Sequence, residues 1–287
     1  MMIRGSNSGA QSDFLQIMAD GSAARLAVAR RVCSDAKILA RAADSDLPPP
    51  LNLAAQGFDL IAELKRRSPA EGELAAASLS LEDQVRAYTA AGAAALSVLT
   101  EPDQFNGSLA DMEAAIKVAN GTPVMRKDFL VDPYQVAEAR ASGASGVLLI
   151  AAILERSKMQ DMMDCAAELG LFVLMEVFDE HDIEHCLPVL EAAGPALNKG
   201  ACQWLLGVNC RDLRSLQVKP SRFESIVSAL PVGVPWVAES GIREAAQAAA
   251  AAELGYRMSL VGTALMKSGT PEATVKRFIA AGREAGS

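Results

Sequence analysis

Charged residues that can transfer protons follow several aliphatic segments of the sequence. Glu63 and Lys65 end one such segment as alternate residues, which point to the same side of an extended chain. Lys127 lies in the sequence RKDF, and Glu176 follows the run LFVLM. The same kind of position is held by Asn209, Arg211 and Glu239. A lysine that donates a proton and a glutamate that accepts one are the groups that general acid–base catalysis requires.

Each of these residues can also be explained by a structural role instead of a catalytic role. A single lysine or glutamate at the end of a strand is commonly one half of an ion pair. Several like charges gathered at one end of one sheet are costly to bury unless the site uses them. The set as a whole therefore favours a catalytic centre over isolated ion pairs.

Two glycine-containing segments indicate a phosphate site. ESG (239–241) and VGT (261–263) follow the last two aliphatic runs of the chain. Glycine lets backbone N–H groups approach phosphate oxygens, and nearby hydroxyl groups add donors. The alternative is that these glycines only permit tight turns. The candidate phosphate-binding residues are Ser68, Ser240, Gly241, Gly262 and Thr263.

Eight aliphatic runs, separated by Ala-rich amphipathic segments, predict the fold. The runs are FDLIAEL (58–64), ALSVLTE (95–101), PVMRKDF (123–129), GVLLIAA (146–152), LFVLMEV (171–177), WLLGVNC (204–210), PWVAESG (235–241) and MSLVGTAL (258–265). Strand and helix alternating eight times in 287 residues predict one (β/α)8 (TIM) barrel, whose active site lies at the carboxyl ends of the strands. An open doubly wound sheet is the alternative, but the sequence lacks the GxGxxG and P-loop motifs typical of it.

Two segments fall outside this repeat. Residues 1–50 contain the basic amphipathic stretch 22–44 and the breaker LPPP (47–50), which predict one additional N-terminal helix and a linker before a barrel domain over 51–287. Residues 191–203 predict a long Gly/Pro-containing connection before the sixth strand, on the face away from the chemistry. We interpret it as a tolerated insertion, with disorder or an oligomer contact as alternatives.

The cysteines and histidines indicate neither disulfides nor a metal. The 5 cysteines form no CxxC pair, which is typical of reduced thiols. His181 and His185 are four residues apart with Cys186 beside them, but the motif is not HExxH and acidic residues surround it. A solvated helix face is favoured over a metal site. We expect no cofactor.

Charge and hydropathy limit the partners. A net charge of −8 without a basic block argues against a nucleic-acid partner. The apolar runs are shorter than the ~18 residues that a membrane span needs. The first 20 residues lack the apolar core of a signal peptide, so we expect a cytoplasmic protein. We expect a small phosphorylated substrate and a monomer or weak homo-oligomer.

The strand-end motifs resemble those of a known family. IAELKRRSP (61–69), PVMRKDFLVDPYQ (123–135), GVNCRDL (207–213), VAESGI (237–242) and LVGTALM (260–266) are similar, in this order, to indole-3-glycerol phosphate synthase. The resemblance runs from about residue 58 to about residue 266. Members of that family convert 1-(o-carboxyphenylamino)-1-deoxyribulose 5-phosphate into indole-3-glycerol phosphate, with loss of carbon dioxide and water, in tryptophan biosynthesis.

The resemblance implies a role for each matching residue. Lys127 would be the general acid and Glu176 the general base, while Lys65 would orient and stabilise the substrate. The polar ring would be completed by Glu63, Asn209 and Glu239. Arg211 would hold the anthranilate carboxylate, and the aromatic ring would pack on Pro69, Phe105, Phe129 and Leu148. The phosphate would bind to Ser68, Gly241, Gly262 and Thr263. The chain departs from the family at Gln104, often an aromatic residue, and at Cys210, commonly Asn or Ser.

Two other functions remain as alternatives. A phosphoribosylanthranilate isomerase is expected to have a cysteine near the end of the first strand, where this chain has Glu63 and Lys65. A non-catalytic, ligand-binding barrel is expected to lack Lys127 or Glu176, and both are present. The sequence therefore favours the synthase.

Overall fold

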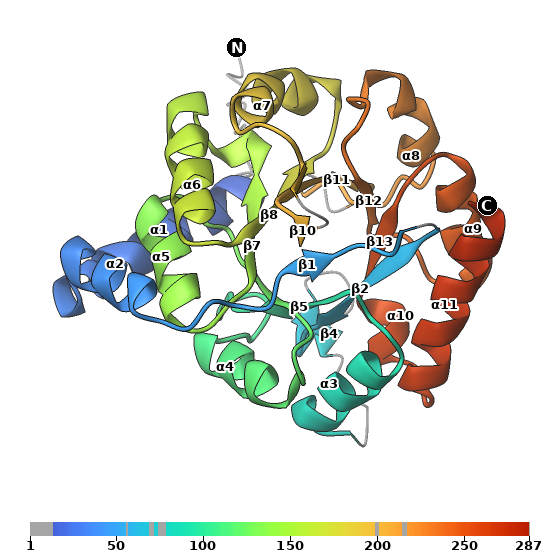
Figure 1. Cartoon of the computed structure of the whole chain (residues 1–287), viewed down its shortest axis with the longest axis horizontal. Coiled ribbons are helices and arrows are strands. Elements are labelled where there is room, and N and C mark those ends of the chain that lie inside the picture. Colours follow the sequence, from blue (N-terminus) through green and yellow to red (C-terminus); the bar gives the residue numbers. More distant parts are fainter. Residues whose placement is uncertain are drawn as a thin grey trace, which may run out of the picture.

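A closed barrel of eight parallel strands forms the body of the molecule (Figure 1). The computed structural model describes residues 14–55, 57–68, 72–73, 79–198, 201–213 and 217–286. The strands run around the barrel in the order β11-β12-β13-β2-β5-β6-β7-β8. Their bounds are Asp59–Leu64 (β2), Ala95–Leu99 (β5), Val124–Lys127 (β6), Gly146–Ile150 (β7), Phe172–Val177 (β8), Trp204–Asn209 (β11), Trp236–Glu239 (β12) and Met258–Val261 (β13). All eight predicted strands and the barrel itself are confirmed.

Helices follow the strands and surround the barrel. They are α3 (Leu81–Ala90), α4 (Leu109–Val118), α5 (Pro133–Ala141), α6 (Arg156–Glu168), α7 (Glu180–Ala192), α8 (Arg222–Ser225), α9 (Ala245–Glu253), α10 (Thr263–Met266) and α11 (Pro271–Ala285), with 3-10 turns at Ala151–Ile153 and Val227–Ala229. Local sequence sets where they begin. The Ser80 side chain accepts the backbone N–H of Asp83 at the start of α3, and α5 begins with Pro133 after the capping residue Asp132.

The barrel strands are buried on both faces, which explains their continuous aliphatic sequences. One face packs against the helices, as Leu60 and Val173 do, and the other fills the barrel interior, as Ile61 and Leu174 do. Because both faces are buried, the strands lack the polar alternation of a sheet that faces water. The carboxyl ends of the strands are therefore where charged side chains can gather.

A small antiparallel sheet closes the amino end of the barrel. It consists of β1 (Leu51–Asn52), β10 (Ala201–Cys202) and β9 (Leu197–Asn198). Leu51 pairs with Cys202, and both side chains are buried in the interior cluster. Residues 191–203, predicted as a long connection on the face away from the chemistry, lie at this end of the barrel; α7 extends to Ala192, and the described part of the connection forms strands that pair with the linker before β2.

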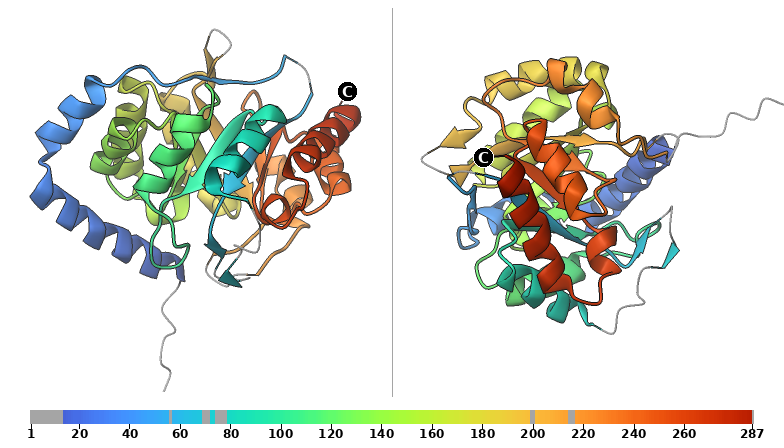
Figure 2. Two further views of the ribbon diagram at one scale, coloured as in Figure 1. Left: turned by 90° about the horizontal axis from the view of Figure 1, so that it is seen from below. Right: turned by 90° about the vertical axis from the view of Figure 1, so that its right-hand side faces the viewer.

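Two helices precede the barrel where one was predicted. They are α1 (Phe14–Val32) and α2 (Asp35–Ala43). The helical conformation is interrupted between them at Ser34, whose ψ of 159° is extended. α2 packs beside α5. α1 lies at the carboxyl end of the barrel, on the same side as the hairpin of β3 (Arg67–Ser68) and β4 (Gly72–Glu73), opposite β1 and β10 (Figure 2).

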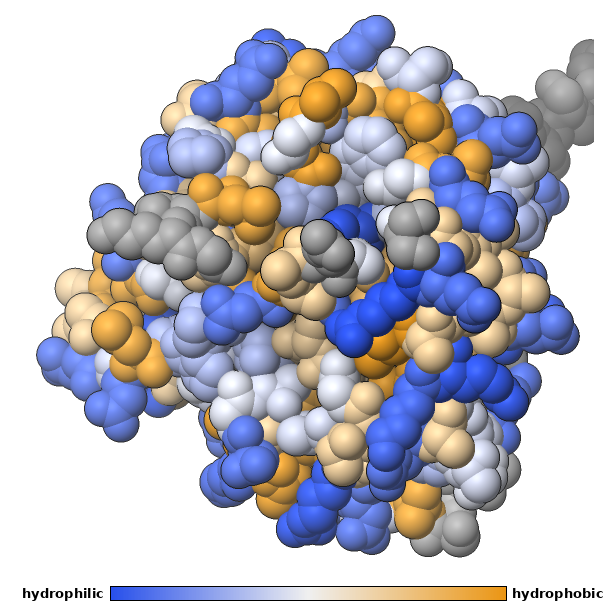
Figure 3. Space-filling model, turned by 45° about the vertical axis from the view of Figure 1, so that its right-hand side comes forward, coloured by the Kyte–Doolittle hydropathy of each residue, from blue (hydrophilic) through white to orange (hydrophobic). Residues whose placement is uncertain are grey.

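The outer surface mixes residue types. On the face seen in Figure 3, hydrophobic and hydrophilic residues are interspersed. Within the described part of the chain, no helix combines the length and apolarity needed to cross a membrane.

Candidate active site

Two adjoining cavities occupy the carboxyl end of the barrel. One has aromatic and aliphatic walls that include Phe105, Phe129 and Leu148. The other is lined by Gly241, Gly262 and their neighbours. The lining residues common to both cavities are Glu63, Lys65, Lys127, Asn209, Arg211 and Ser240. A polar ring therefore separates an apolar half of the site from a glycine-rich half.

Lys127 lies between two buried glutamates. Its Nζ is 3.1 Å from Glu176 Oε2 and 3.4 Å from Glu239 Oε2. These groups come from β6, β8 and β12, so the closed barrel is required to bring them together. Burial disfavours the charged lysine, but the carboxylates of Glu176, Glu239 and Glu63 outweigh it and raise the pKa of Lys127. Lys127 is consequently protonated in the free protein.

The surroundings of Glu239 favour its neutral form. Burial raises the pKa of Glu239 well above its usual range, and the nearby Glu176 raises it further against the opposing effect of Lys127. Oε1 of Glu239 and Oε1 of Glu176 have no hydrogen-bond partner among the described residues.

Glu63 and Lys65 form a second ion pair at the end of β2. Lys65 Nζ donates to Glu63 Oε1 at 2.7 Å. Burial opposes ionisation of Glu63, but Lys65, Lys127 and Arg211 prevail and lower the pKa of Glu63. Glu63 is thus an ionised carboxylate, in contrast to Glu239.

Two glycines leave the space that these carboxylates occupy. A Cβ at Gly262 would overlap the Glu63 carboxylate and lie 3.1 Å from Lys65 Nζ, and a Cβ at Gly207 would overlap Oε1 of Glu239. Gly262, predicted as a phosphate-loop residue, therefore also has a structural role in the polar ring. The role of Gly207 could not be predicted from the sequence, because the side chain that fills its space comes from the neighbouring strand.

The loops after β11 and β12 place polar groups beside the ring. Asn209 pairs with Glu239 in the register of β11 and β12, and its Oδ1 accepts the backbone N–H of Arg211 at 2.9 Å. Ser240 and Gly241 have positive φ values of 64° and 69°. At Gly241 a Cβ would lie 2.7 Å from Cys210 Sγ, so this turn requires glycine for both conformation and space.

The apolar half of the site is built from aromatic side chains. Phe105 and Phe129 have ring centroids 6.2 Å apart, and Phe14 of α1 meets Phe129 edge-on at 6.4 Å. Of the predicted site residues, Pro69 lies outside the described residues and all the others line one or both cavities. Lining residues that the sequence analysis missed are Phe14, Leu99, Asp128, Ile150, Leu213, Ile242, Arg243 and Leu260. Asp128 is part of the RKDF motif, and this position could have indicated it as a site residue.

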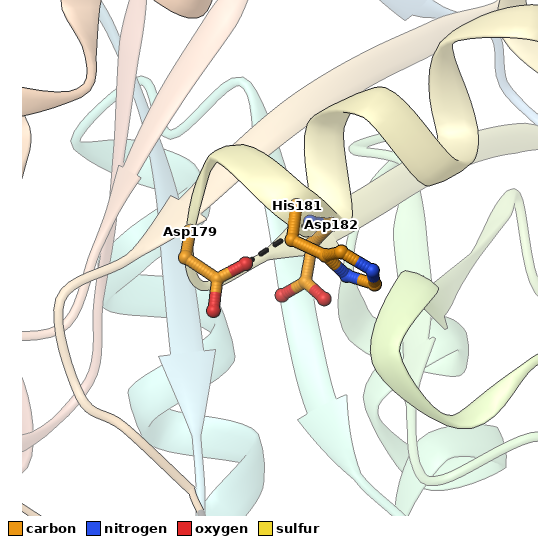
Figure 4. A group of neighbouring side chains, drawn as sticks. All are labelled: Asp179, His181 and Asp182. Carbon is orange, nitrogen blue, oxygen red and sulfur yellow. Dashed lines mark hydrogen bonds between the residues drawn. The ribbon is translucent and has the colours of Figure 1, made fainter.

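The histidines of α7 do not join the site. His185 Nε2 contacts the Leu154 carbonyl oxygen at 2.8 Å, and the buried Cys186 contacts the Ile183 carbonyl. His181 lies near Asp179 and Asp182 (Figure 4). Asp179 accepts the backbone N–H of Asp182, and Asp182 accepts that of Phe178, so both acids cap the start of the helix. The described contacts of this cluster are those of a helix terminus.

Fold and site together define a (β/α)8 barrel with paired lysine and glutamate side chains at the carboxyl ends of its strands. A family model for indole-3-glycerol phosphate synthase matches residues 17–278. The synthase of Mycolicibacterium gilvum (strain PYR-GCK) is 41% identical over 272 residues, 93% of this chain and 94% of that protein. The synthase of Nocardioides sp. (strain ATCC BAA-499 / JS614) is 42% identical over 258 residues, 88% and 94% of the two chains.

The chain belongs to the indole-3-glycerol phosphate synthase family, which comprises carboxy-lyases of tryptophan biosynthesis. Solved structures show a shared fold at lower identity. 3-Hexulose-6-phosphate synthase from Salmonella typhimurium has a TM-score of 0.58 at 14% identity, covering 79% of this chain and 100% of its own. Thiamine phosphate pyrophosphorylase from Pyrococcus furiosus has a TM-score of 0.56 at 17% identity, covering 79% and 96%.

Proposed function

We propose that this chain converts 1-(o-carboxyphenylamino)-1-deoxyribulose 5-phosphate into indole-3-glycerol phosphate, carbon dioxide and water. The observation that carries the proposal is the position of Lys127, in contact with two buried glutamates where an apolar cavity meets a glycine-rich one. Family membership supports the same reaction.

The two halves of the site fit the two ends of this substrate. The aromatic ring packs against Phe105, Phe129 and Leu148, and its carboxylate pairs with Arg211. The phosphate lies in the other half, where backbone N–H groups and hydroxyls are the donors. The phosphate-binding residues of this proposal are Ser68, Ser240, Gly241, Gly262 and Thr263. The deoxyribulose carbonyl then lies beside Lys127 and Lys65.

Lys127 acts as the acid that starts the reaction. Its ammonium donates a proton to the carbonyl oxygen as the ring carbon bearing the carboxylate attacks the carbonyl carbon. Lys65, paired with the ionised Glu63, stabilises the charge that develops on oxygen. Carbon dioxide leaves from this attacking ring carbon, and the electron pair of the broken carbon–carbon bond restores the aromatic ring.

Glu176 acts as the base in the loss of water. It removes a proton from the carbon next to the nitrogen, while the new hydroxyl leaves as water with a proton donated by Lys127. Because Glu176 and Lys127 are 3.1 Å apart, the proton taken by the glutamate can return to the lysine. One further proton comes from solvent for each turnover, since a carboxylate leaves as neutral carbon dioxide. Asn209 and Glu239 complete the polar ring around these groups.

We propose that the protein is a cytoplasmic monomer or weak homo-oligomer. We also propose that it does not bind nucleic acid, which the net charge of −8 supports.

The test is direct turnover by purified protein in the presence of a chelator. The carboxyphenylamino substrate is expected to yield a fluorescent indole product and one carbon dioxide per indole. Folded protein that binds this substrate without forming indole would overturn the proposal.

A further inference from the structure

We infer that Arg25 of α1 is a positioning residue for the apolar half of the active site. It joins this helix to two buried carboxylates at the cavity rim, and the inference rests on the function proposed above. Arg25 Nη2 is 3.0 Å from Asp128 Oδ1, and Nη1 is 3.4 Å from Glu101 Oε1. Glu101 is 0% and Asp128 3% exposed.

Each carboxylate fixes the backbone of one aromatic residue of the cavity wall. Glu101 follows β5 and accepts the backbone N–H of Phe105 at 3.1 Å through Oε2. Asp128 lies between Lys127 and Phe129 and accepts the backbone N–H of Phe129 at 2.9 Å. In both cases, therefore, Arg25 contacts the carboxylate that positions a phenylalanine of the apolar cavity wall.

These carboxylates keep other partners when Arg25 is removed. Glu101 also accepts the backbone N–H groups of Asp103 and Gln104, at 3.0 and 2.7 Å. Asp128 Oδ2 accepts the Thr100 hydroxyl at 2.8 Å and lies 3.3 Å from Arg126 Nη2. The loops after β5 and β6 therefore keep these hydrogen bonds when Arg25 is removed. Loss of Arg25 should weaken the attachment of α1 to the barrel without disturbing the barrel itself.

Arg25 lies between the amino-terminal part of α1, which covers the apolar cavity, and the carboxyl-terminal part, which packs against α5. Towards the amino end, Phe14 lines the cavity, and Leu15 and Met18 are buried in the interior cluster. Towards the other end, Leu26 packs with Tyr134 of α5, and Arg30 pairs with Asp132. These ion pairs with Glu101 and Asp128 set the approach of Phe14 to Phe129, whose ring lies beside that of Phe105 in the cavity wall. Loss of Arg25 should therefore loosen the apolar half while leaving Lys127 and Glu176 in place.

The test compares Arg25→Met and Arg25→Lys with a control on the same helix, Arg31→Met, which removes one positive charge from an exposed side chain in the last turn of α1. Arg25→Met should raise KM by about tenfold or more and change kcat by less than about threefold, because the ring is misplaced while the reacting groups are kept. Arg25→Lys, which keeps the charge, should recover part of the loss. Arg31→Met should match the wild type.

Hydrogen exchange separates a freed helix from general unfolding. In Arg25→Met, faster exchange should be confined to α1, with the barrel strands unchanged. A wild-type KM in Arg25→Met, an equal effect of Arg31→Met, or faster exchange throughout the barrel would overturn the inference. If the wild-type protein itself forms no indole, the proposed function fails; if it does so and Arg25→Met matches it, this inference alone fails.

Discussion

The ammonium of Lys127 on β6 lies 3.1 Å from the Glu176 carboxylate on β8. The proposed acid and base are therefore already in contact before the substrate binds. The contact keeps Lys127 protonated, because Glu176, Glu239 and Glu63 together outweigh burial and raise its pKa. It also links the two proton transfers, since the proton taken by Glu176 has a direct return path to Lys127.

Glu239→Gln should preserve activity. Burial and the neighbouring Glu176 raise the pKa of Glu239 well above its ordinary range, so glutamine copies the neutral form that these surroundings favour. We expect kcat within about fivefold of wild type, whereas Glu176→Gln should lose a factor of about 10²–10⁴ by removing the base. Equal losses in the two variants, measured at pH 7, would contradict the division of roles.

The same substitution should change how stability depends on pH. The folded protein retains a proton on Glu239 that the unfolded chain releases above about pH 4.5, so this group favours folding at low pH and loses that contribution as pH rises towards its folded pKa. Glu239→Gln removes the effect. Its melting temperature relative to wild type should be higher at pH 7 than at pH 4.5, and a difference independent of pH would show that Glu239 is ionised in the fold.

Arg211→Gln should weaken binding of the substrate carboxylate. Loss of a charged hydrogen-bonding partner is expected to raise KM by about 10- to 100-fold. Unreactive analogues reduced at the carbonyl allow binding to be measured alone. An analogue without the ring carboxylate should bind wild type and variant equally; a difference that persists for this analogue would place Arg211 elsewhere.

Gly262→Ala should disrupt the polar ring. The added methyl group overlaps Glu63 and crowds Lys65, so we expect a destabilisation of about 1–3 kcal/mol and a fall in kcat/KM of about tenfold or more. Gly269→Ala is the matched control, because a Cβ there meets nothing within 4 Å. Urea unfolding and steady-state rates on both variants check this; similar behaviour of the two would argue against crowding of Glu63.

The barrel could be predicted because its determinants are local. Each strand is aliphatic on both faces, and charged residues such as Lys127 and Glu176 mark the strand ends. A closed barrel brings all such ends to one rim, so most site residues followed once the strands were placed.

Features that depend on distant contacts could not be predicted in this way. Arg25 pairs with Asp128 across 103 residues of sequence. Leu51 pairs with Cys202 and helps to cover the amino end of the barrel, although both segments resemble linkers in the sequence. Gly207 appears ordinary until Glu239 of the neighbouring strand is seen to occupy its space. The break at Ser34 likewise lies within a continuous amphipathic pattern.

The most direct test of the central claim is the value of kcat for Lys127→Met at saturating substrate. Loss of the acid should lower kcat by a factor of about 10²–10⁴, while binding of the reduced analogue changes by less than about tenfold. Lys158→Met, at a lysine whose side chain is 40% exposed, should match wild type. Wild-type turnover in Lys127→Met, or a loss confined to binding, would contradict the proposed mechanism.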